Sequence, residues 1–229
     1  VSRGTHVQVV DLKTGTLAAD ITDTSGVHGI AIDDKSGHGF TSNGRANTVT
    51  EFDLKTHRRI QDITVDQGPD CIIFDPATER VFTFNGRAGT SSVIDAVSGK
   101  NLGTIQLPGR PEFAVSDGKG YVYNNIEDKS EVAQIDSRAM KVVNTWPIAP
   151  GDGPSGIAMD TKHNRVFSVC GNQIMTVLDP STGKIVATPA IGQGDDASNF
   201  DNKYQIAFGP NGRDGTLTEV HEDSPNKYS

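Results

Sequence analysis

Five positions at a regular spacing carry side chains that could bind a cation or a polar ligand. Each stands five residues before an aspartate of an evenly spaced series, and together they are His28, Asp70, Glu112, Ser155 and Asp196. Imidazole, carboxylate and hydroxyl groups can all bind divalent metals. We predict a divalent-metal site with the ligands His28, Asp70, Glu112 and Asp196, and with Ser155 as a further ligand-binding group. Sets of oxygen donors alone suit calcium, whereas a histidine among carboxylates favours zinc, manganese or iron.

The chemistry of such a site depends on how many coordination positions stay open. With three or fewer protein ligands, the ion keeps a bound water and lowers its pKa enough to give hydroxide near neutral pH. That site would hydrolyse an ester, a lactone or a phosphotriester, and Arg45 or Arg87 would steady the oxyanion. With no open position, the same side chains hold a cation or a small molecule, or they only cap strands and bind water. The sequence leaves open whether the chain is an enzyme.

Three predicted turns share the tripeptide Asn-Gly-Arg. Their asparagines and arginines are Asn43, Arg45, Asn85, Arg87, Asn211 and Arg213. Asn-Gly favours a two-residue hairpin turn, because both residues tolerate a positive φ. The arginines could hold an anionic group through the planar guanidinium. We predict that Asn43, Asn85 and Arg213 bind ligand on the same face as the metal site, and Arg45 and Arg87 are the candidate catalytic residues.

Evenly spaced aspartates indicate the elements that must position these side chains. One series ends the first strand of each unit, and a second ends the third strand; the members are Asp33, Asp75, Asp117, Asp160 and Asp201, and Asp11, Asp53, Asp95, Asp136 and Asp179. Successive members are 41 to 43 residues apart. Apolar runs between turn residues predict four short strands per unit, as at 27–33, 39–43, 48–53 and 58–65. No segment keeps the helical period, so we expect almost no helix.

A repeat of about 40 to 45 residues with four strands is typical of a β-propeller blade. We therefore predict an all-β propeller of four-stranded antiparallel blades, about five blades' worth of sequence, in a single domain over residues 1–229. The units are 27–68, 69–110, 111–153 and 154–195, with partial units at 1–26 and 196–229. In a propeller, the residues before each first strand gather at one mouth of the central channel, where we expect the metal site.

Neither end of the chain falls on a unit boundary. Strands at 6–11 and 17–23 could complete the blade begun at 196–223 and so close the ring. Otherwise we expect the open blade edges to pair with a second copy of the chain, because unpaired strand edges recruit partners. A further interpretation is that the chain is a fragment of a larger, seven-bladed propeller.

The second strands of the units share a short run of residues. GFTSN (39–43), VFTFN (81–85) and YVYNN (121–125) resemble the repeat of the YVTN-type, YncE-like β-propeller family, whereas VFSVC (166–170) and AFGPN (207–211) depart from it. The resemblance implies a propeller fold and a periplasmic or secreted location, although this chain shows no signal peptide. We expect a binding scaffold for a metal ion or a small molecule. A metal-dependent hydrolase and a protein-interaction platform are the alternatives.

The acidic composition narrows the range of partners. A net charge of -8 and a pI near 5.2 make binding to nucleic acid or to an anionic membrane surface unfavourable. The single tryptophan, Trp146, leaves little for stacking on bases. No apolar run approaches the roughly 20 residues of a membrane span. A cation or a metal ion is the ligand that this charge favours.

The cysteines and the remaining histidines are expected to be structural. Cys71 and Cys170 lie in strands of different units, and we expect both to be buried free thiols. We assign no ligand to the other histidines, which are His6, His38, His57, His163 and His221. Three of them, including His163, fall in turns, where we expect them to be exposed.

Overall fold

The structure is a computed structural model that describes residues 1–229, and nearly all of its regular elements are β-strands. There are 22 strands and one short 3-10 helix, η1 (Glu127–Lys129). Five of the six sheets hold four strands, paired in chain order and antiparallel. The predicted all-β fold of four-stranded antiparallel units is confirmed. No helix has the length and the apolar composition that crossing a bilayer requires.

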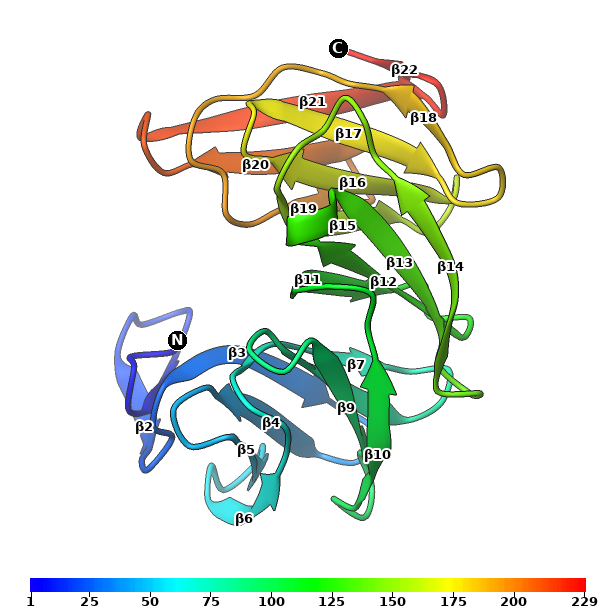
Figure 1. The fold of residues 1–229 in the computed structure, drawn as a ribbon. Coiled ribbons are helices and arrows are strands. Elements are labelled where there is room, and N and C mark those ends of the chain that lie inside the picture. The colour runs from blue at the N-terminus through cyan, green and yellow to red at the C-terminus, as the bar shows by residue number, and fades with distance from the viewer. The chain divides into compact units, whose positions relative to one another are not determined.

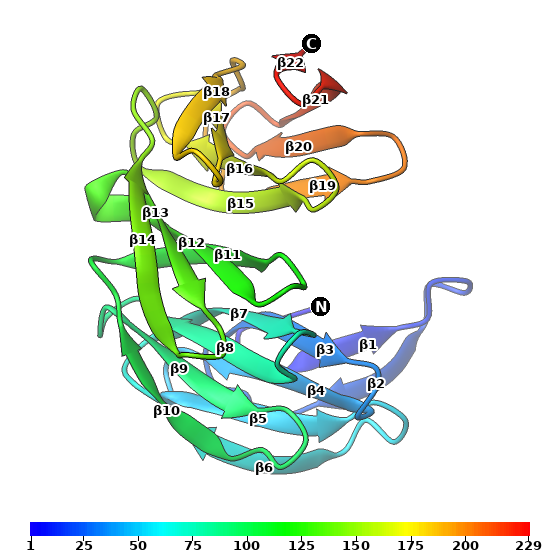
Figure 2. The same cartoon turned by 90° about the vertical axis from the view of Figure 1, so that its right-hand side faces the viewer.

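The first of two compact units comprises Val1–Leu107 and Ser137–Lys141. Its two-stranded sheet pairs β1 (Val7–Val10) with β2 (Leu17–Ile21), and its four-stranded sheets are β3 (Val27–Asp33), β4 (His38–Asn43), β5 (Thr48–Asp53) and β6 (Arg59–Thr64), and β7 (Pro69–Asp75), β8 (Arg80–Asn85), β9 (Thr90–Asp95) and β10 (Asn101–Gln106). Figures 1 and 2 show these two four-stranded sheets packed together. Both contribute to one apolar core, which includes Phe40, Val49, Val81 and Ile94.

The second unit comprises Pro108–Asp136 and Val142–Ser229. Its three sheets are β11 (Pro111–Ser116), β12 (Tyr121–Ile126), β13 (Glu131–Asp136) and β14 (Lys141–Pro147); β15 (Pro154–Asp160), β16 (Arg165–Cys170), β17 (Ile174–Asp179) and β18 (Lys184–Ala187); and β19 (Asn199–Asp201), β20 (Ile206–Asn211), β21 (Thr216–Ser224) and β22 (Lys227–Tyr228). The first two of these sheets share a core around Tyr123 and Val166. The last two share a core around Phe167 and Phe200.

The evenly spaced aspartates fix the turns that follow their strands. Asp33 Oδ1 accepts a hydrogen bond from the Lys35 amide at 3.0 Å, and Asp160 Oδ1 accepts one from the Lys162 amide at 2.8 Å. These bonds satisfy amides that leave the strand ladder where the chain turns. Eight of the ten aspartates are the last residue of their strand in the structure, and Asp11 and Asp117 follow theirs directly.

The N-terminal hairpin and the last sheet each have their own strand pairing. β1 and β2 form a separate two-stranded sheet, and the last sheet has its own fourth strand, β22. The chain turns back after β21 and pairs Glu222 with Tyr228. That the strands at 6–11 and 17–23 complete the blade begun at 196–223 stays a prediction.

Candidate metal centre

A histidine and two carboxylates of the second unit converge beside the turn that follows β15. Asp160 is the last residue of β15, His163 lies in the turn, and Glu222 lies on β21 of the next sheet. His163 Nδ1 is 2.6 Å from Asp160 Oδ2 and 3.2 Å from Glu222 Oε1. The three potential ligand atoms all lie within 4.8 Å of one another. We call these three residues the buried cluster.

The local sequence explains how the turn presents His163. Asp160 Oδ1 accepts the hydrogen bond from the Lys162 amide, so Oδ2 is the oxygen that faces the imidazole. Three residues after the corresponding strand end in the first unit stands Thr78, whose hydroxyl donates to Asp75 Oδ2 at 2.6 Å. His163 therefore occupies the place of a residue that bonds the strand-end carboxylate. Its imidazole is larger than a hydroxyl and reaches Glu222 as well.

Burial makes the charges of the cluster costly. Asp160 is 0% exposed and Glu222 is 4% exposed, whereas the His163 side chain is 26% exposed. Neither oxygen of the Glu222 carboxylate has a hydrogen-bond partner. Desolvation, followed by the charge of Asp160, raises the pKa of Glu222. Two buried carboxylates at this separation require a cation or a proton between them.

The sequence prediction for His163 was wrong, and Glu222 was missed. His163 was expected to be exposed, but it contacts two buried carboxylates. Glu222 follows His221, which stands where other units have the third-strand aspartate. The residues that follow those aspartates are Leu12, Leu54, Ala96, Ser137 and Pro180. Glu222 is thus a carboxylate at a position that is uncharged in the other repeats. This difference in the repeat alignment could have identified it as a candidate site residue.

Three of the four predicted metal ligands lie at a repeated irregularity of the first strands, and Asp196 precedes β19. The pairing register shifts between Val27 and Ile30 in β3, and β7, β11 and β15 have the same shift at their equivalent residues. The residues placed in these bulges include His28, Asp70, Glu112 and Ser155. A bulge turns side chains out of the regular pleat, and bulges are common beside binding sites.

The structure brings the predicted ligands together as pairs. Within the first unit, His28 Nδ1 lies 3.3 Å from Asp70 Oδ1, and 58% and 56% of these side chains are exposed. Within the second unit, Ser155 Oγ donates to Asp196 Oδ1 at 3.1 Å. Glu112 is half-buried in β11. A common metal site for His28, Asp70, Glu112 and Asp196 stays a prediction.

The Asn-Gly-Arg turns are not the predicted two-residue hairpins. Asn43 pairs with Thr48, so four residues connect β4 to β5. The positive φ falls on the last residue of each loop, which is Asn47, Gly89 or Gly215. The prediction was wrong because Asn43 stays in its strand, where its side chain has better partners than a turn would give it.

The asparagines and arginines of these turns have structural contacts. The Nδ2 atoms of Asn43, Asn85 and Asn211 each reach two hydroxyl groups of their own sheet. The stems of the exposed Arg45, Arg87 and Arg213 lie over glycines with positive φ, and an added Cβ on Gly26, Gly68 or Gly194 would come within 2.8 Å of the arginine Cγ. Ligand binding by Asn43, Asn85 and Arg213, and catalysis by Arg45 or Arg87, stay predictions.

A second carboxylate with buried oxygens, Asp195, gives a pH-dependent prediction. Desolvation and then the charge of Asp214 raise the pKa of Asp195 to about 6, and neither carboxylate oxygen has a hydrogen-bond partner. Because the folded state binds this proton more tightly than the unfolded state, the stabilisation is present below pH 4 and is lost as the pH rises through about 6. We expect Asp195→Asn to increase stability at pH 7.5 by about 1 kcal/mol, after allowance for solvent screening.

Urea unfolding at pH 7.5 and at pH 4.0, followed by Trp146 fluorescence, measures this effect. The gain from Asp195→Asn should be smaller at the lower pH. The matched control is Asp196→Asn, which changes the adjacent exposed carboxylate. An equal gain at both values of pH would contradict the prediction.

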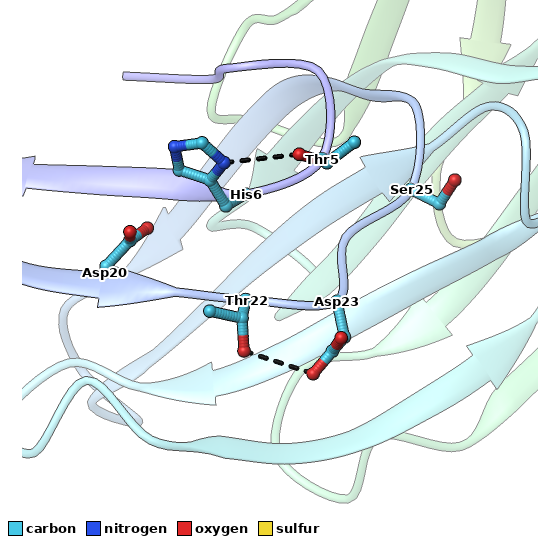
Figure 3. Close-up of a pocket in the computed structure, with 6 residues that line it drawn as sticks. All are labelled: Thr5, His6, Asp20, Thr22, Asp23 and Ser25. Atoms are coloured by element: carbon cyan, nitrogen blue, oxygen red, sulfur yellow. Dashed lines mark hydrogen bonds between the residues drawn. The ribbon is translucent and has the colours of Figure 1, made fainter.

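An open polar hollow of about 490 Å³ lies at the N-terminal hairpin (Figure 3). Its lining residues are Thr5, His6, Asp20, Thr22, Asp23 and Ser25. His6 Nδ1 lies 3.3 Å from the Thr5 hydroxyl, and Thr22 donates to Asp23 at 3.1 Å. Both carboxylates are exposed to water. The hollow therefore lacks the buried carboxylates that distinguish the buried cluster.

Both cysteines are buried free thiols, as the sequence predicts. Burial raises the pKa of Cys170 to about 11. Only the thiolate is a strong nucleophile or metal ligand. Cys170 is therefore a core residue and contributes no reactive group.

Comparison with known proteins supports the fold and leaves the site unassigned. No family profile matches the chain, and no curated protein matches it. The fold is similar to a solved structure of Kuenenia stuttgartiensis hydrazine synthase, with a TM-score of 0.63 and 14% identity over 95% of this chain and 90% of that chain. With its repeated four-stranded antiparallel sheets, the chain has a propeller-like fold. Such architectures host unrelated functions, so function must be argued from the site.

Proposed function

We propose that this propeller-like chain is a binding scaffold that holds one divalent metal ion at Asp160, His163 and Glu222. The observation that carries the proposal is the Glu222 carboxylate, which is 4% exposed, has no hydrogen-bond partner and approaches a second buried carboxylate. A divalent cation would neutralise both carboxylates and leave the imidazole uncharged. The YVTN-type membership and the extracytoplasmic location that it implies belong to the same proposal.

The donor set favours zinc, manganese or iron. One imidazole nitrogen with two carboxylate oxygens suits these ions better than calcium, which prefers a larger number of oxygens. Two ligand atoms of a tetrahedral zinc site are roughly 3.3 Å apart for bonds of about 2.0 Å. The 3.2 Å between His163 Nδ1 and Glu222 Oε1 fits that separation. Asp160 Oδ2, at 2.6 Å from the same nitrogen, would move outward by roughly 0.7 Å.

The burial of the ligands favours holding an ion over turning over a substrate. A catalytic metal keeps a position open to water and substrate, whereas a structural metal is enclosed by the protein. Asp160 and Glu222 are almost completely buried. The hydrolase alternative would need an ion that water and substrate can reach. The exposed pair of His28 and Asp70 is the candidate position for such an ion.

Metal content of the dialysed protein, measured by plasma mass spectrometry after incubation with zinc, manganese or iron, tests the proposal. We expect about one equivalent in the wild type and less than about a tenth in His163→Ala and Glu222→Gln, because each removes one of three ligands. The matched control is His38→Ala. His38 Nδ1 lies 2.7 Å from the buried Glu51, and its side chain is 24% exposed, but the pair has no third ligand.

Two outcomes would contradict the proposal. A wild type that binds none of these ions would show that the buried cluster is only an ion pair. Metal that is retained in Glu222→Gln but lost in Asp70→Ala would instead place the ion at the predicted site of His28 and Asp70.

A further inference from the structure

We infer that the metal ion of the buried cluster clamps the C-terminal hairpin, residues 221–229, onto the sheet of β15–β18. This inference rests on the proposed function and adds what the bound ion does. The hairpin consists of the end of β21, a turn, and the two residues of β22. It forms the edge of the last sheet (Figure 1).

The ligands of the cluster come from two sheets. Asp160 and His163 belong to β15 and the turn after it, whereas Glu222 belongs to β21. An ion that coordinates all three residues would therefore cross-link the two sheets. Glu222 is also the residue that pairs with Tyr228 on β22. The cross-link would thus act at the base of the hairpin.

Few other contacts hold the hairpin in place. Arg165 Nε donates to the Pro225 carbonyl at 2.7 Å, and Arg165 Nη2 donates to Asn226 Oδ1 at 3.0 Å. The Tyr228 ring packs edge-on against Phe167, with ring centroids 5.9 Å apart. The hairpin itself is held by two residue pairs between β21 and β22 and by two backbone hydrogen bonds between His221 and Ser229. Edge segments with so few contacts open at low free energy, so one additional cross-link has a large effect there.

The charges at the base of the hairpin make its closure depend on the ion. Asp160 and Glu222 bring two carboxylates together in a place that excludes water. Without a cation, their repulsion is relieved by His163 or by separation of the hairpin from the sheet. With a cation, the same carboxylates are held together. The ion therefore strengthens the contact between the two sheets.

The first unit shows which part of this contact is general. Arg80 stands at the position equivalent to Arg165, and it donates to the carbonyls of Ser137 and Arg138 in a following turn. The arginine contact with a following turn is thus repeated in the chain. Glu222 has no counterpart there, because the residue at its position is Ser137. The second carboxylate is the feature that adds metal dependence to a common contact.

Hydrogen exchange followed by mass spectrometry, on the full chain with zinc or after chelation, tests the clamp. We expect zinc at about 100 times its dissociation constant to slow exchange in peptides from 221–229 by up to about 100-fold, because opening must release the ion. Peptides from 80–95 in the first unit serve as the internal control and should change little. In Glu222→Gln, zinc should leave the hairpin unchanged.

The outcomes separate the clamp from the proposed function. If the wild type binds one equivalent of zinc while exchange in 221–229 is unchanged, the clamp is wrong and the metal site stands. If exchange slows equally in 80–95, the ion stabilises the whole chain and the local clamp is again wrong. If the wild type binds no zinc, manganese or iron, both proposals fail.

Discussion

Replacing Phe167 by alanine is expected to lower the free energy of unfolding of the second unit by about 3–5 kcal/mol. Phe167 is fully buried in the core shared by the last two sheets. Its ring stacks on Phe200, with centroids 5.1 Å apart, and meets the Tyr228 ring edge-on. Truncation therefore removes buried apolar surface and two aromatic contacts. It also leaves a cavity between two sheets, because the paired strands cannot move together to fill it.

Urea unfolding followed by tryptophan fluorescence measures this loss in the relevant unit. Trp146 is the only tryptophan, and it lies on β14 of the second unit. The matched control is Phe113→Ala, because Phe113 belongs to the same unit and is 38% exposed. We expect the control to cost less than about 1 kcal/mol. Equal losses in both variants would mean that the core around Phe167 does not determine the stability of the unit.

Zinc is expected to stabilise the second unit of the wild-type chain by about 2.7 kcal/mol at 100 times its dissociation constant. The physical reason is linkage, since the ion binds the folded cluster and finds no preformed site in the unfolded chain. For this unit, which holds roughly half of the 229 residues, this corresponds to a rise in its unfolding midpoint of roughly 10 °C. Thermal unfolding at increasing zinc concentration, followed by circular dichroism, measures the shift.

Glu222→Gln is the variant that isolates this linkage. It should abolish the zinc-dependent shift, because it removes a charged ligand while keeping the size of the side chain. In the absence of metal it should be more stable than the wild type, since it ends the repulsion between two buried carboxylates. His38→Ala should keep the zinc-dependent shift. A shift of the same size in Glu222→Gln would show that zinc stabilises the chain elsewhere.

The sequence repeat made the fold predictable, whereas the geometry of its turns could not be predicted. The aspartate series marks strand ends because a carboxylate at the strand end accepts hydrogen bonds from the amides of the turn that follows. The Asn-Gly-Arg turns were mispredicted because Asn43 is held in the sheet by two hydroxyl groups. The hydrogen bonds of the buried Asn43 amide therefore outweigh the preference of Asn-Gly for a two-residue turn.

The candidate site shows the same division. The repeat alignment identified Asp160 as a strand end, and it could have identified Glu222 as a charge at an uncharged position. His163 looked like an exposed turn residue, because its burial depends on a strand from another sheet. The periodicity within one sequence repeat does not predict which residue of the next repeat packs against the turn of the first.

By itself, the sequence determined the strands, their order within each unit and the propeller-like fold, because these follow from local alternation of apolar residues and from repeated turn chemistry. Only the tertiary structure decided that Asp160, His163 and Glu222 meet, and that residues 221–229 supply the last strand. The reason is physical: the free energy of a charged group depends on its burial and its neighbours, and packing between sheets sets both.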